Sequence, residues 1–336
     1  LAKKVRLKLK KTAIVTGGLG FIGSHMVDLL LSKNFKVYIL DNLSGGRIEN
    51  INHHKNNSNL SLLKKDICKL DGSSKIFKNA DYVFHFAGLG DIVPSIENPE
   101  KYFLNNAYGT LKLMEQLKNS KIKKIVYAAS SSCYGLSAKN VSENSKINLL
   151  HPYAFSKYTG EKIIFNWNKV YGIPANSIRI FNAYGLRVRT TGAYGAVFGV
   201  FLKQKLANKP LTIVGDGDQT RDFVHVSDVT KAFLRAAETK ISGEYFNLGS
   251  GKEIKINYLA KLIGGKKVNL PDRPGEPRYS RANISKIKKR LKWYPKKKFE
   301  DGVKEMLKNI DYWKEAPLWS KEKIQGATKK WFKAFK

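Results

Sequence analysis

A tyrosine and a lysine four residues apart, Tyr153 and Lys157 in the stretch YAFSK, form the most suggestive chemical pair in the chain. Residues at i and i+4 share one helix face, and an ammonium beside a phenol stabilises the phenolate and lowers its pKa. The spacing alone often arises by chance in helices. Ser130, in the stretch AASSSCYG, follows an apolar run, and a hydroxyl at a strand end can share a substrate's proton. The three side chains together predict an acid–base site.

A glycine-rich turn supplies the second chemical signal. Gly17, Gly20 and Gly23 follow the apolar run KTAIVT and open a stretch with helical spacing. Glycine lets the backbone approach a pyrophosphate, and a helix N-terminus offers free N–H groups to it, although such turns also serve helix–strand packing. Asp41 ends the next apolar run, 18 residues beyond Gly23. A carboxylate there can accept ribose hydroxyls and would repel a 2′-phosphate, so the pattern predicts a dinucleotide site that prefers NAD to NADP.

Short apolar runs that alternate with amphipathic segments must position these residues. Near-continuous apolar strands between helices predict a parallel sheet that is covered on both faces. We therefore expect an α/β fold, a Rossmann-type doubly wound parallel sheet with a smaller mixed α/β C-terminal substrate lobe. The expected strands are residues 11–16, 36–41, 60–66, 82–88, 123–130, 176–181 and 244–249, the third to fifth of them short and buried. The long expected helices are residues 99–118 and 152–171.

The composition narrows the class of protein. Two well-separated cysteines, Cys68 and Cys133, and six histidines without HxxH or HxxxH spacing favour neither a disulfide frame nor a metal site. No apolar stretch approaches the roughly 18 to 20 residues that a membrane span needs, and the basic start LAKKVRLKLKK lacks the apolar core of a signal peptide. We expect a cytoplasmic protein.

The formal charge of +34 is extreme, and a positive surface attracts polyanions. The lysines are spread along the chain, however, and aromatic residues suited to base stacking are not interleaved with them before the last fifty residues. A general coding bias toward lysine explains this distribution, so we expect no nucleic-acid partner. For the segment YWKEAPLWSKEKIQGATKKWFKAFK, a docked amphipathic tail and contact with a membrane surface are the two alternatives.

Beyond these local patterns, residues 11–310 resemble the extended short-chain dehydrogenase/reductases, and within them the nucleotide-sugar epimerases similar to UDP-glucose 4-epimerase. The motifs that carry the resemblance are TGGLGFIGSH, LDNLSGG, VFHFAG, NNAYGT, YAASSSCYG, HPYAFSKYTGEK, RIFNAYG, GDGDQTRDFVHVSD and NLGSG. The resemblance implies an NAD-binding Rossmann domain of residues 1–182 plus 225–250. It also implies a nucleotide-sugar-binding lobe of residues 183–224 plus 251–336, with a basic C-terminal tail.

The resemblance implies three groups of site residues. The catalytic residues would be Ser130, Tyr153 and Lys157. The residues contacting NAD would be Gly17, Gly20, Phe21, Ile22, Gly23, Asp41, Asn42, Asp66, Ile67, Ala87, Asn105, Tyr153 and Lys157. The residues contacting a UDP-sugar would be Ser130, Ser132, Asn182, Arg221, Arg273 and Ser280. For Asp66, a simple cap at a strand end is nearly as good an interpretation as an adenine contact.

The resemblance also implies a reaction and a substrate. Similar dehydratases carry an Asp–Glu pair after the catalytic hydroxyl, and decarboxylases carry Glu at the position of Ser132, whereas Ser131 and Ser132 provide no acid for an elimination. A small Ser280 at the wall of the sugar pocket favours 4-epimerisation of UDP-N-acetylglucosamine, or of the corresponding uronic acid, over UDP-glucose. A register shifted by one would bring Tyr279 into the pocket and reverse that preference.

Three alternatives remain open. The chain could epimerise UDP-glucose and UDP-galactose, or it could be another nucleotide-sugar dehydratase or decarboxylase. Some epimerase-like proteins bind RNA instead, although such a binder does not need the intact set of Ser130, Tyr153 and Lys157. The family further implies a homodimer in which helices 99–118 and 152–171 pair as a four-helix bundle.

Overall fold

A computed structural model describes residues 10–72, 75–136, 140–188, 197–272 and 274–335. Its centre is a seven-stranded parallel sheet in the order β11-β6-β5-β4-β1-β2-β3. The strands are β1 (Thr12–Thr16), β2 (Lys36–Asp41), β3 (Leu60–Lys64), β4 (Tyr82–His85), β5 (Lys124–Ser130), β6 (Ala175–Ile180) and β11 (Glu244–Leu248). The predicted doubly wound parallel sheet is confirmed, and the ends of its strands lie within three residues of the expected positions.

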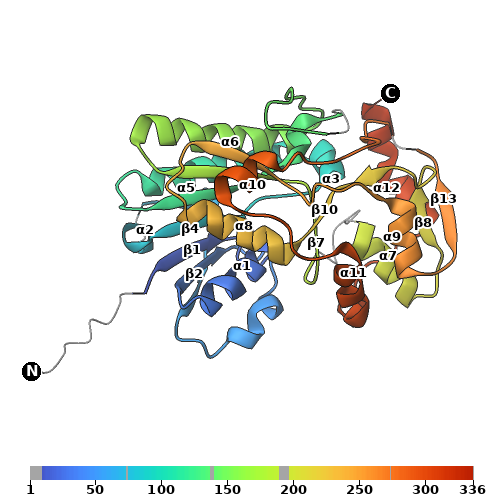
Figure 1. Cartoon of the computed structure of the whole chain (residues 1–336), viewed down its shortest axis with the longest axis horizontal. Helices are drawn as coiled ribbons and strands as arrows, with labels where there is room; N and C mark the ends of the chain where they lie inside the picture. The colour runs from blue at the N-terminus through green and yellow to red at the C-terminus, as the bar shows by residue number, and fades with distance from the viewer. Residues whose placement is uncertain (1–9, 73–74, 137–139, 189–196, 273, 336) are drawn as a thin grey trace, which may run out of the picture.

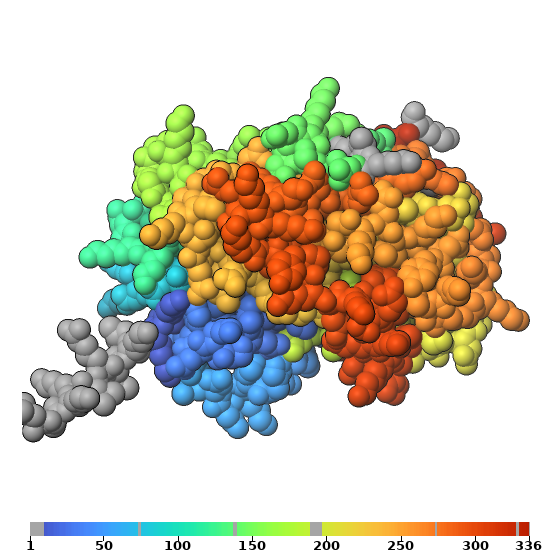
Figure 2. Space-filling model, in the orientation of Figure 1, coloured from blue at the N-terminus to red at the C-terminus, as the bar shows by residue number. Residues whose placement is uncertain are grey.

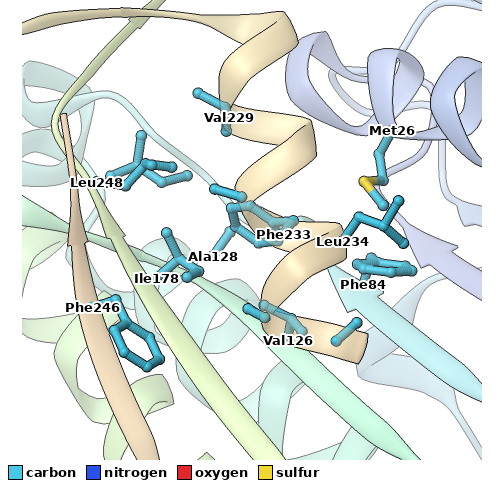
Figure 3. Packing of buried hydrophobic residues seen from close by; sticks show 14 of the residues in the cluster. Met26, Phe84, Val126, Ala128, Ile178, Val229, Phe233, Leu234, Phe246 and Leu248 are labelled. Atoms are coloured by element: carbon cyan, nitrogen blue, oxygen red, sulfur yellow. The ribbon is translucent and has the colours of Figure 1, made fainter. Parts of the chain in front are cut away.

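Helices cover both faces of this sheet (Figure 1). On one face lie α1 (Phe21–Ser32) and α8 (Val226–Glu238), and on the other lie α5 (Gly109–Leu117) and α6 (Pro152–Tyr171). Figure 3 shows Phe233 of α8 next to Ala128 of β5, and Leu234 next to Met26 of α1. Phe233 is completely buried, and truncating such a side chain to alanine costs about 3–5 kcal/mol.

The expected helix 99–118 is present as three consecutive segments. They are α4 (Pro99–Phe103), a π-helical turn η3 (Leu104–Tyr108) and α5, and they pack against α6. The expected helix 152–171 is α6 itself. It begins cleanly because Pro152 occupies its first position and the Nδ1 atom of His151 accepts the backbone N–H of Ala154 at 3.1 Å.

The strand β3 differs from its expected burial. It lies at the open edge of the sheet, and Leu62 is 41% exposed. A strand at the edge of a sheet has a neighbour on one side only and is less covered than an interior strand. The strand expected at residues 60–66 is therefore present, but the prediction that it is buried was wrong. The interior strands β4 and β5 are buried along their whole length, as expected.

A smaller lobe of mixed structure stands beside the sheet, which confirms the expected second lobe. Its strand pairs are β7 (Asn182–Tyr184) with β10 (Phe223–His225), β8 (Leu211–Val214) with β13 (Lys267–Leu270), and β9 (Thr220–Arg221) with β12 (Ile254–Lys255). Its main helices are α7 (Val197–Leu206), α9 (Ile256–Ile263) and α11 (Phe299–Lys308). Its aromatic core contains the fully buried side chains of Tyr184, Phe198 and Trp313.

The remaining helical segments are short, apart from the last. They are η1 (Ile48–His54), η2 (Ile67–Lys69), α2 (Ile76–Asn79), α3 (Ile92–Glu97), η4 (Ser131–Tyr134), α10 (Ser285–Leu291), η5 (Ile310–Trp313) and α12 (Lys321–Ala334). The apolar side chains of α12 point inward, since Ile324 and Trp331 are 4% and 2% exposed. The tail is therefore docked on the protein, which was the first of the two alternatives for it.

A strap of residues 292–298 joins α10 to α11. Figure 2 shows α10, the strap and α11 as an orange-red band on the surface that runs into the second lobe, of which α11 is part. The buried carboxylate of Asp228 on α8 accepts the backbone N–H groups of Lys296 and Lys297, each at 2.8 Å. The indole N–H of Trp293 donates to the backbone oxygen of Asp228 at 3.1 Å. Asp228 of α8 thus binds the strap at three of its residues.

Candidate active site

The structure brings Ser130, Tyr153 and Lys157 together. Ser130 is the last residue of β5, and Tyr153 and Lys157 lie on the first two turns of α6, which packs on that strand. The carboxyl ends of parallel strands meet at one edge of a sheet, which is where ligands bind in folds of this kind. Separate elements therefore place the three predicted catalytic residues at the ligand-binding edge of the sheet.

Two cavities meet at these residues. One, of about 420 Å³, lies over the glycine turn, and the other, of about 470 Å³, lies between the sheet and the second lobe. The residues that line both cavities are Gly90, Asp91, Ser130, Tyr153, Phe181 and Ala183. Lys157 lines the first cavity only. The hydroxyl-bearing pair Ser130 and Tyr153 is thus placed to face two ligands at once, one in each cavity.

The acid–base groups have shifted pKa values. Burial raises the pKa of Tyr153 above its ordinary value, and a hydrogen bond with Ser130 opposes this shift. Burial lowers the pKa of Lys157 to about 7, which attraction to Glu161 partly offsets. A lysine with that pKa carries only part of its charge at neutral pH. Burial decides the direction of the Tyr153 shift in this structure, and the expectation that Lys157 lowers the pKa of Tyr153 stays a prediction.

The glycine turn forms a tight cradle at the first cavity. Gly17 has a φ of +67°, and a Cβ atom there would lie 2.7 Å from the backbone nitrogen of Ala87. A Cβ atom at Gly23 would collide with the backbone oxygen of Gly17. Neither position can carry a side chain without moving the backbone, so the turn stays close to the N-terminus of α1, where free N–H groups and the helix dipole attract an anion.

Asp41 lies at the edge of the same cavity. Its carboxylate accepts the backbone N–H groups of Leu19 at 3.0 Å and Leu43 at 2.8 Å, while burial raises its pKa. A carboxylate offers about four acceptor positions, so two remain for ribose hydroxyls. A Cβ atom on Gly46 would lie 2.9 Å from both carboxylate oxygens, so any side chain at this position would press against the carboxylate.

Most residues predicted to contact the cofactor line this cavity. They are Gly17, Gly20, Phe21, Ile22, Gly23, Asp41, Asn42, Ile67, Ala87, Asn105, Tyr153 and Lys157. Asp66 is not among the lining residues. Its carboxylate accepts the backbone N–H of Cys68 at 2.8 Å and the amide of Asn42 at 3.0 Å, so it caps η2, as its alternative interpretation had it.

The neighbouring Asn106 has a role that the sequence analysis missed. Its side chain is buried, accepts the backbone N–H of Leu89 at 2.7 Å, and donates to the backbone oxygen of Leu89 and to Ser156. It therefore fixes the loop that follows β4 against α6, at the wall of the cavity. The motif NNAYGT contains both Asn105 and Asn106, and the sequence does not show which of them is buried. The amide of Asn105 donates to the backbone oxygen of Lys101.

The second cavity contains the predicted substrate residues that the structure describes, namely Ser130, Ser132, Asn182, Arg221 and Ser280. Arg273 lies outside the described residues. Tyr279 also lines this cavity and is 37% exposed. Because Tyr279 and Ser280 both reach the cavity, the importance of Ser280 for substrate choice stays a prediction.

Arg221 is held in place from several sides. Its guanidinium donates to the backbone oxygens of Thr220 and Pro277, each at 2.9 Å, and to the carboxylate of Glu276 at 3.2 Å. Burial lowers its pKa, and the charge of Glu276 opposes that shift. Such a fixed guanidinium is suited to binding a phosphate with its remaining N–H groups.

Asp91, His151, Ile324 and Trp331 are among the residues of this cavity that were not predicted from the sequence. Asp91 precedes α3 and its negative charge acts on Tyr153 by raising its pKa. The ring of His151 stacks on that of Tyr153 with an interplanar angle of 2°, and burial lowers the pKa of His151 to about 4. His151 lies two residues before Tyr153 in HPYAFSK, and this nearness in sequence could have indicated that it belongs to the site. No sequence pattern connects Trp331 to the site.

One cluster of metal-ligand residue types lies elsewhere. Asp28 accepts hydrogen bonds from His53 and His54 at 2.9 Å each, and Arg187 forms an ion pair with it at 2.8 Å. These residues line neither ligand cavity. The guanidinium already neutralises the carboxylate, so the cluster is a hub of polar contacts between α1, η1 and residue 187.

No helix in the described part of the chain has both the length and the apolar character for crossing a bilayer.

Comparison with known proteins agrees with this geometry. The family described as GDP-mannose 4,6 dehydratase matches residues 14–306. A putative UDP-glucose 4-epimerase of Methanocaldococcus jannaschii is 39% identical over 303 residues, which are 88% of this chain and 96% of that protein.

Solved structures are similar over nearly the same length. The UDP-N-acetylglucosamine 4-epimerase from Methanobrevibacter ruminantium M1, in complex with UDP-N-acetylmuramic acid, has a TM-score of 0.84 and 35% identity, covering 89% of this chain and 99% of that one. The UDP-glucuronic acid 4-epimerase from Bacillus cereus, in complex with UDP-glucuronic acid and NAD, has a TM-score of 0.83 and 33% identity, covering 90% and 99%. With the glycine cradle, the sheet order and the serine–tyrosine–lysine set in place, the chain belongs to the GDP-mannose 4,6 dehydratase family of extended short-chain dehydrogenase/reductases.

Proposed function

We propose that this protein is an NAD-dependent 4-epimerase of a UDP-sugar. The observation that carries the proposal is the position of Ser130 and Tyr153 at the junction of two cavities, one fitted to a dinucleotide and the other containing Arg221. An acid–base group at that junction can act on a sugar hydroxyl beside a nicotinamide. Relatives that carry the names of UDP-sugar 4-epimerases support this assignment.

The cofactor cavity fits NAD by its own residues. The backbone at Gly17 and Gly23 can approach a pyrophosphate, and Asp41 has acceptor positions left for the ribose. NAD would supply a reversible hydride acceptor and a positively charged ring that favours the phenolate form of the tyrosine. Tyr153 removes the proton from the sugar O4 and later returns it, Ser130 hydrogen-bonds the same oxygen, and Lys157 holds the nicotinamide ribose.

Among epimerase substrates, we favour UDP-N-acetylglucosamine and UDP-N-acetylgalactosamine. Ser132 and Ser280 are small residues of the substrate cavity and leave room for an acetamido group. The carboxylate of Asp91 lies at the junction and would repel a uronic acid, so the neutral sugar is preferred over the uronic form considered above. The absence of an acid at Ser131 and Ser132 disfavours dehydration and decarboxylation.

A panel of UDP-sugars with chromatographic separation of the products tests this proposal. We expect UDP-N-acetylglucosamine to turn over faster than UDP-glucose, and Ser280→Tyr to remove that preference because overpacking costs about 1–3 kcal/mol. Faster turnover of UDP-glucose by the wild-type protein would contradict the pocket argument alone, whereas turnover of none of the panel would contradict the epimerase proposal.

The role of Asp91 has its own test. Asp91→Asn should raise kcat/KM for UDP-glucuronate roughly tenfold relative to UDP-N-acetylglucosamine, since it removes a like charge at the junction. Glu276→Gln, at another carboxylate of the cavity, is the control: Glu276 pairs with Arg221, so its loss should affect both substrates alike and leave the ratio unchanged. An unchanged ratio in Asp91→Asn would show that the uronic carboxylate does not approach this side chain.

A further inference from the structure

The C-terminal helix α12 lies outside the residues that match the family, yet it reaches the substrate cavity. The match ends at residue 306, and α12 spans Lys321–Ala334. Ile324 and Trp331 lie seven residues apart, so they share one face of the helix, and both line the cavity. Figure 1 shows α12 beside α3, the helix that supplies Ile92 and Val93 to the same cavity.

Trp331 lies near the reacting end of the cavity. Its ring centroid is 6.4 Å from that of His151, and the His151 ring stacks on Tyr153 at 5.9 Å. In the proposed reaction Tyr153 faces the sugar C4, and the two ring contacts place Trp331 on the Tyr153 side of the cavity. Arg221 belongs to β9 in the second lobe and binds the loop at Glu276 and Pro277. The wall formed by α12 therefore lies between the Tyr153 side of the cavity and the loop that Arg221 contacts.

The same helix is fixed to the loop that closes the cavity. The indole N–H of Trp331 donates to the backbone oxygen of Pro274 at 2.6 Å. The ring of Phe335 packs on Gly275, where an added Cβ atom would lie only 2.8 Å from the ring. An exposed ion pair of Lys330 with Glu97 on α3 contributes little, because both side chains are solvated. Aromatic packing therefore keeps Trp331 in position against the cavity.

We propose that α12 is a wall of the sugar subsite, with Trp331 as a specificity-determining residue that contacts the sugar of the bound UDP-sugar. This inference rests on the proposed function. Trp331 is buried, and only a small part of its indole reaches the cavity. That part is apolar, because the N–H group is bonded to Pro274, and it suits the C–H face of a pyranose ring or the methyl of an acetamido group. We expect the diphosphate to depend less on this wall, because the guanidinium of Arg221 is held by β9 and by the loop at Glu276 and Pro277 and has no hydrogen bond to α12 among the described residues.

Calorimetric titration of the dinucleotide-loaded protein with UDP and, separately, with UDP-N-acetylglucosamine tests the wall. In Trp331→Ala we expect at least about tenfold weaker binding of the UDP-sugar, with UDP binding changed less than about twofold. Trp331→Phe keeps the flat ring but loses the bond to Pro274, and it should bind both ligands nearly as the wild type does. Lys333→Ala, on the exposed side of the same helix, is the matched control and should change neither affinity.

The outcomes separate this inference from the proposed function. Equal losses for UDP and the UDP-sugar in Trp331→Ala would overturn the wall, because they would show that the helix acts through the loop at 274–277. Unchanged affinities for both ligands would overturn it as well. If thermal unfolding shows Trp331→Ala to be misfolded, Ile324→Ala replaces it with the same expected pattern. Failure of the wild-type protein to epimerise any UDP-sugar contradicts the proposed function alone, since the binding difference is measured without turnover.

Discussion

Tyr153 is the residue on which the proposed chemistry depends most. Replacing it with phenylalanine removes one hydroxyl and keeps the ring that stacks on His151. We expect Tyr153→Phe to fold normally and to retain its bound NAD, while kcat falls by roughly two to four orders of magnitude, the usual effect of a positioned acid–base group. Steady-state turnover and the dinucleotide content of the purified protein measure the two effects. Turnover close to that of the wild type would refute the assigned role.

Lys157 makes stability depend on pH. Its pKa is about 7 in the folded protein against 10.5 in the unfolded chain, so between these values the unfolded chain binds more protons and the free energy of unfolding rises with pH. The penalty for burying this lysine is complete below pH 7 and is gone above about pH 10.5. Lys157→Met should therefore raise the free energy of unfolding by a few kcal/mol at pH 6 and much less at pH 10.

Urea unfolding after removal of bound dinucleotide measures this difference. Lys162→Met, at an exposed position of the same helix, is the control and should show no such dependence on pH. A gain for Lys157→Met that is the same at both pH values would mean that the lysine is not buried with a lowered pKa. NAD retention and turnover should fall in Lys157→Met, because one side chain serves the ribose and the tyrosine.

At the scale of elements, a buried ion pair joins α6 to the sheet. The carboxylate of Glu161 accepts hydrogen bonds from two side-chain nitrogens of Arg179 on β6, the shortest being 2.6 Å. It also accepts a hydrogen bond from the hydroxyl of Ser177. A further nitrogen of Arg179 donates to the hydroxyl of Tyr134, which donates to Asn247 at 2.7 Å. This network links α6, β6, η4 and β11, so it fixes the position of the helix that carries Tyr153 relative to the sheet.

Breaking one half of this pair should cost much more than removing both halves. Glu161→Ala leaves the Arg179 charge buried without its partner, and we expect a loss of about 3–5 kcal/mol in the free energy of unfolding, whereas Glu161→Met combined with Arg179→Met should lose far less. Urea unfolding of the three proteins decides the matter. The exposed pair of Glu115 with Lys118 is a suitable comparison, since its removal should have little effect. A double variant as unstable as Glu161→Ala would rule out the unpaired charge as the cause.

The order of elements was predictable from the sequence, and the details that were missed have physical reasons. The apolar strands and the helix that begins at HPYAFSK follow from periodicity and capping, which are local. The exposure of β3 follows from its place at the edge of the sheet, and the order of strands in a sheet cannot be read from local sequence patterns. Trp331 reached the site by a contact across some 180 positions of sequence with His151, and no spacing rule predicts such a contact. Asp66 was ambiguous because a cap and an adenine contact need the same residue type.

At the scale of the whole molecule, an apolar patch on α4, η3 and α6 points to a second copy of the chain. Leu104, Tyr108 and Phe155 are 47%, 44% and 50% exposed, and the ring of Phe155 packs edge-on against Phe103 at 5.1 Å. These are the helices that the family resemblance pairs in a dimer. We expect Phe155→Glu to convert a dimer into a monomer, as measured by light scattering after size exclusion. Leu62→Glu, on the exposed rim of β3, should leave the dimer intact, and a wild-type monomer would exclude this interface.

The charge of +34 is a property of the whole molecule as well. One hollow away from the active site is lined by basic residues, which are Lys10, Lys11, Lys33, Lys231, Arg235, Lys292 and Lys296. Polyanions will be attracted to such a surface in a manner that weakens with salt. Retention on RNA at physiological ionic strength, combined with a lack of turnover of any UDP-sugar, would favour the alternative of an RNA-binding relative. Retention that coexists with turnover would be attributed to general charge.

The strap that Asp228 holds has a consequence for proteolysis. Its sequence contains Lys296, Lys297 and Lys298 in succession at the surface, which is the kind of site that trypsin prefers. Cleavage requires the chain around the site to open locally into an extended form, and here the amides of two of those lysines are bonded to a buried carboxylate. We expect trypsin to leave this segment intact in the native protein, and Asp228→Ala to make it one of the first places that trypsin cuts, as mass spectrometry of the fragments would show.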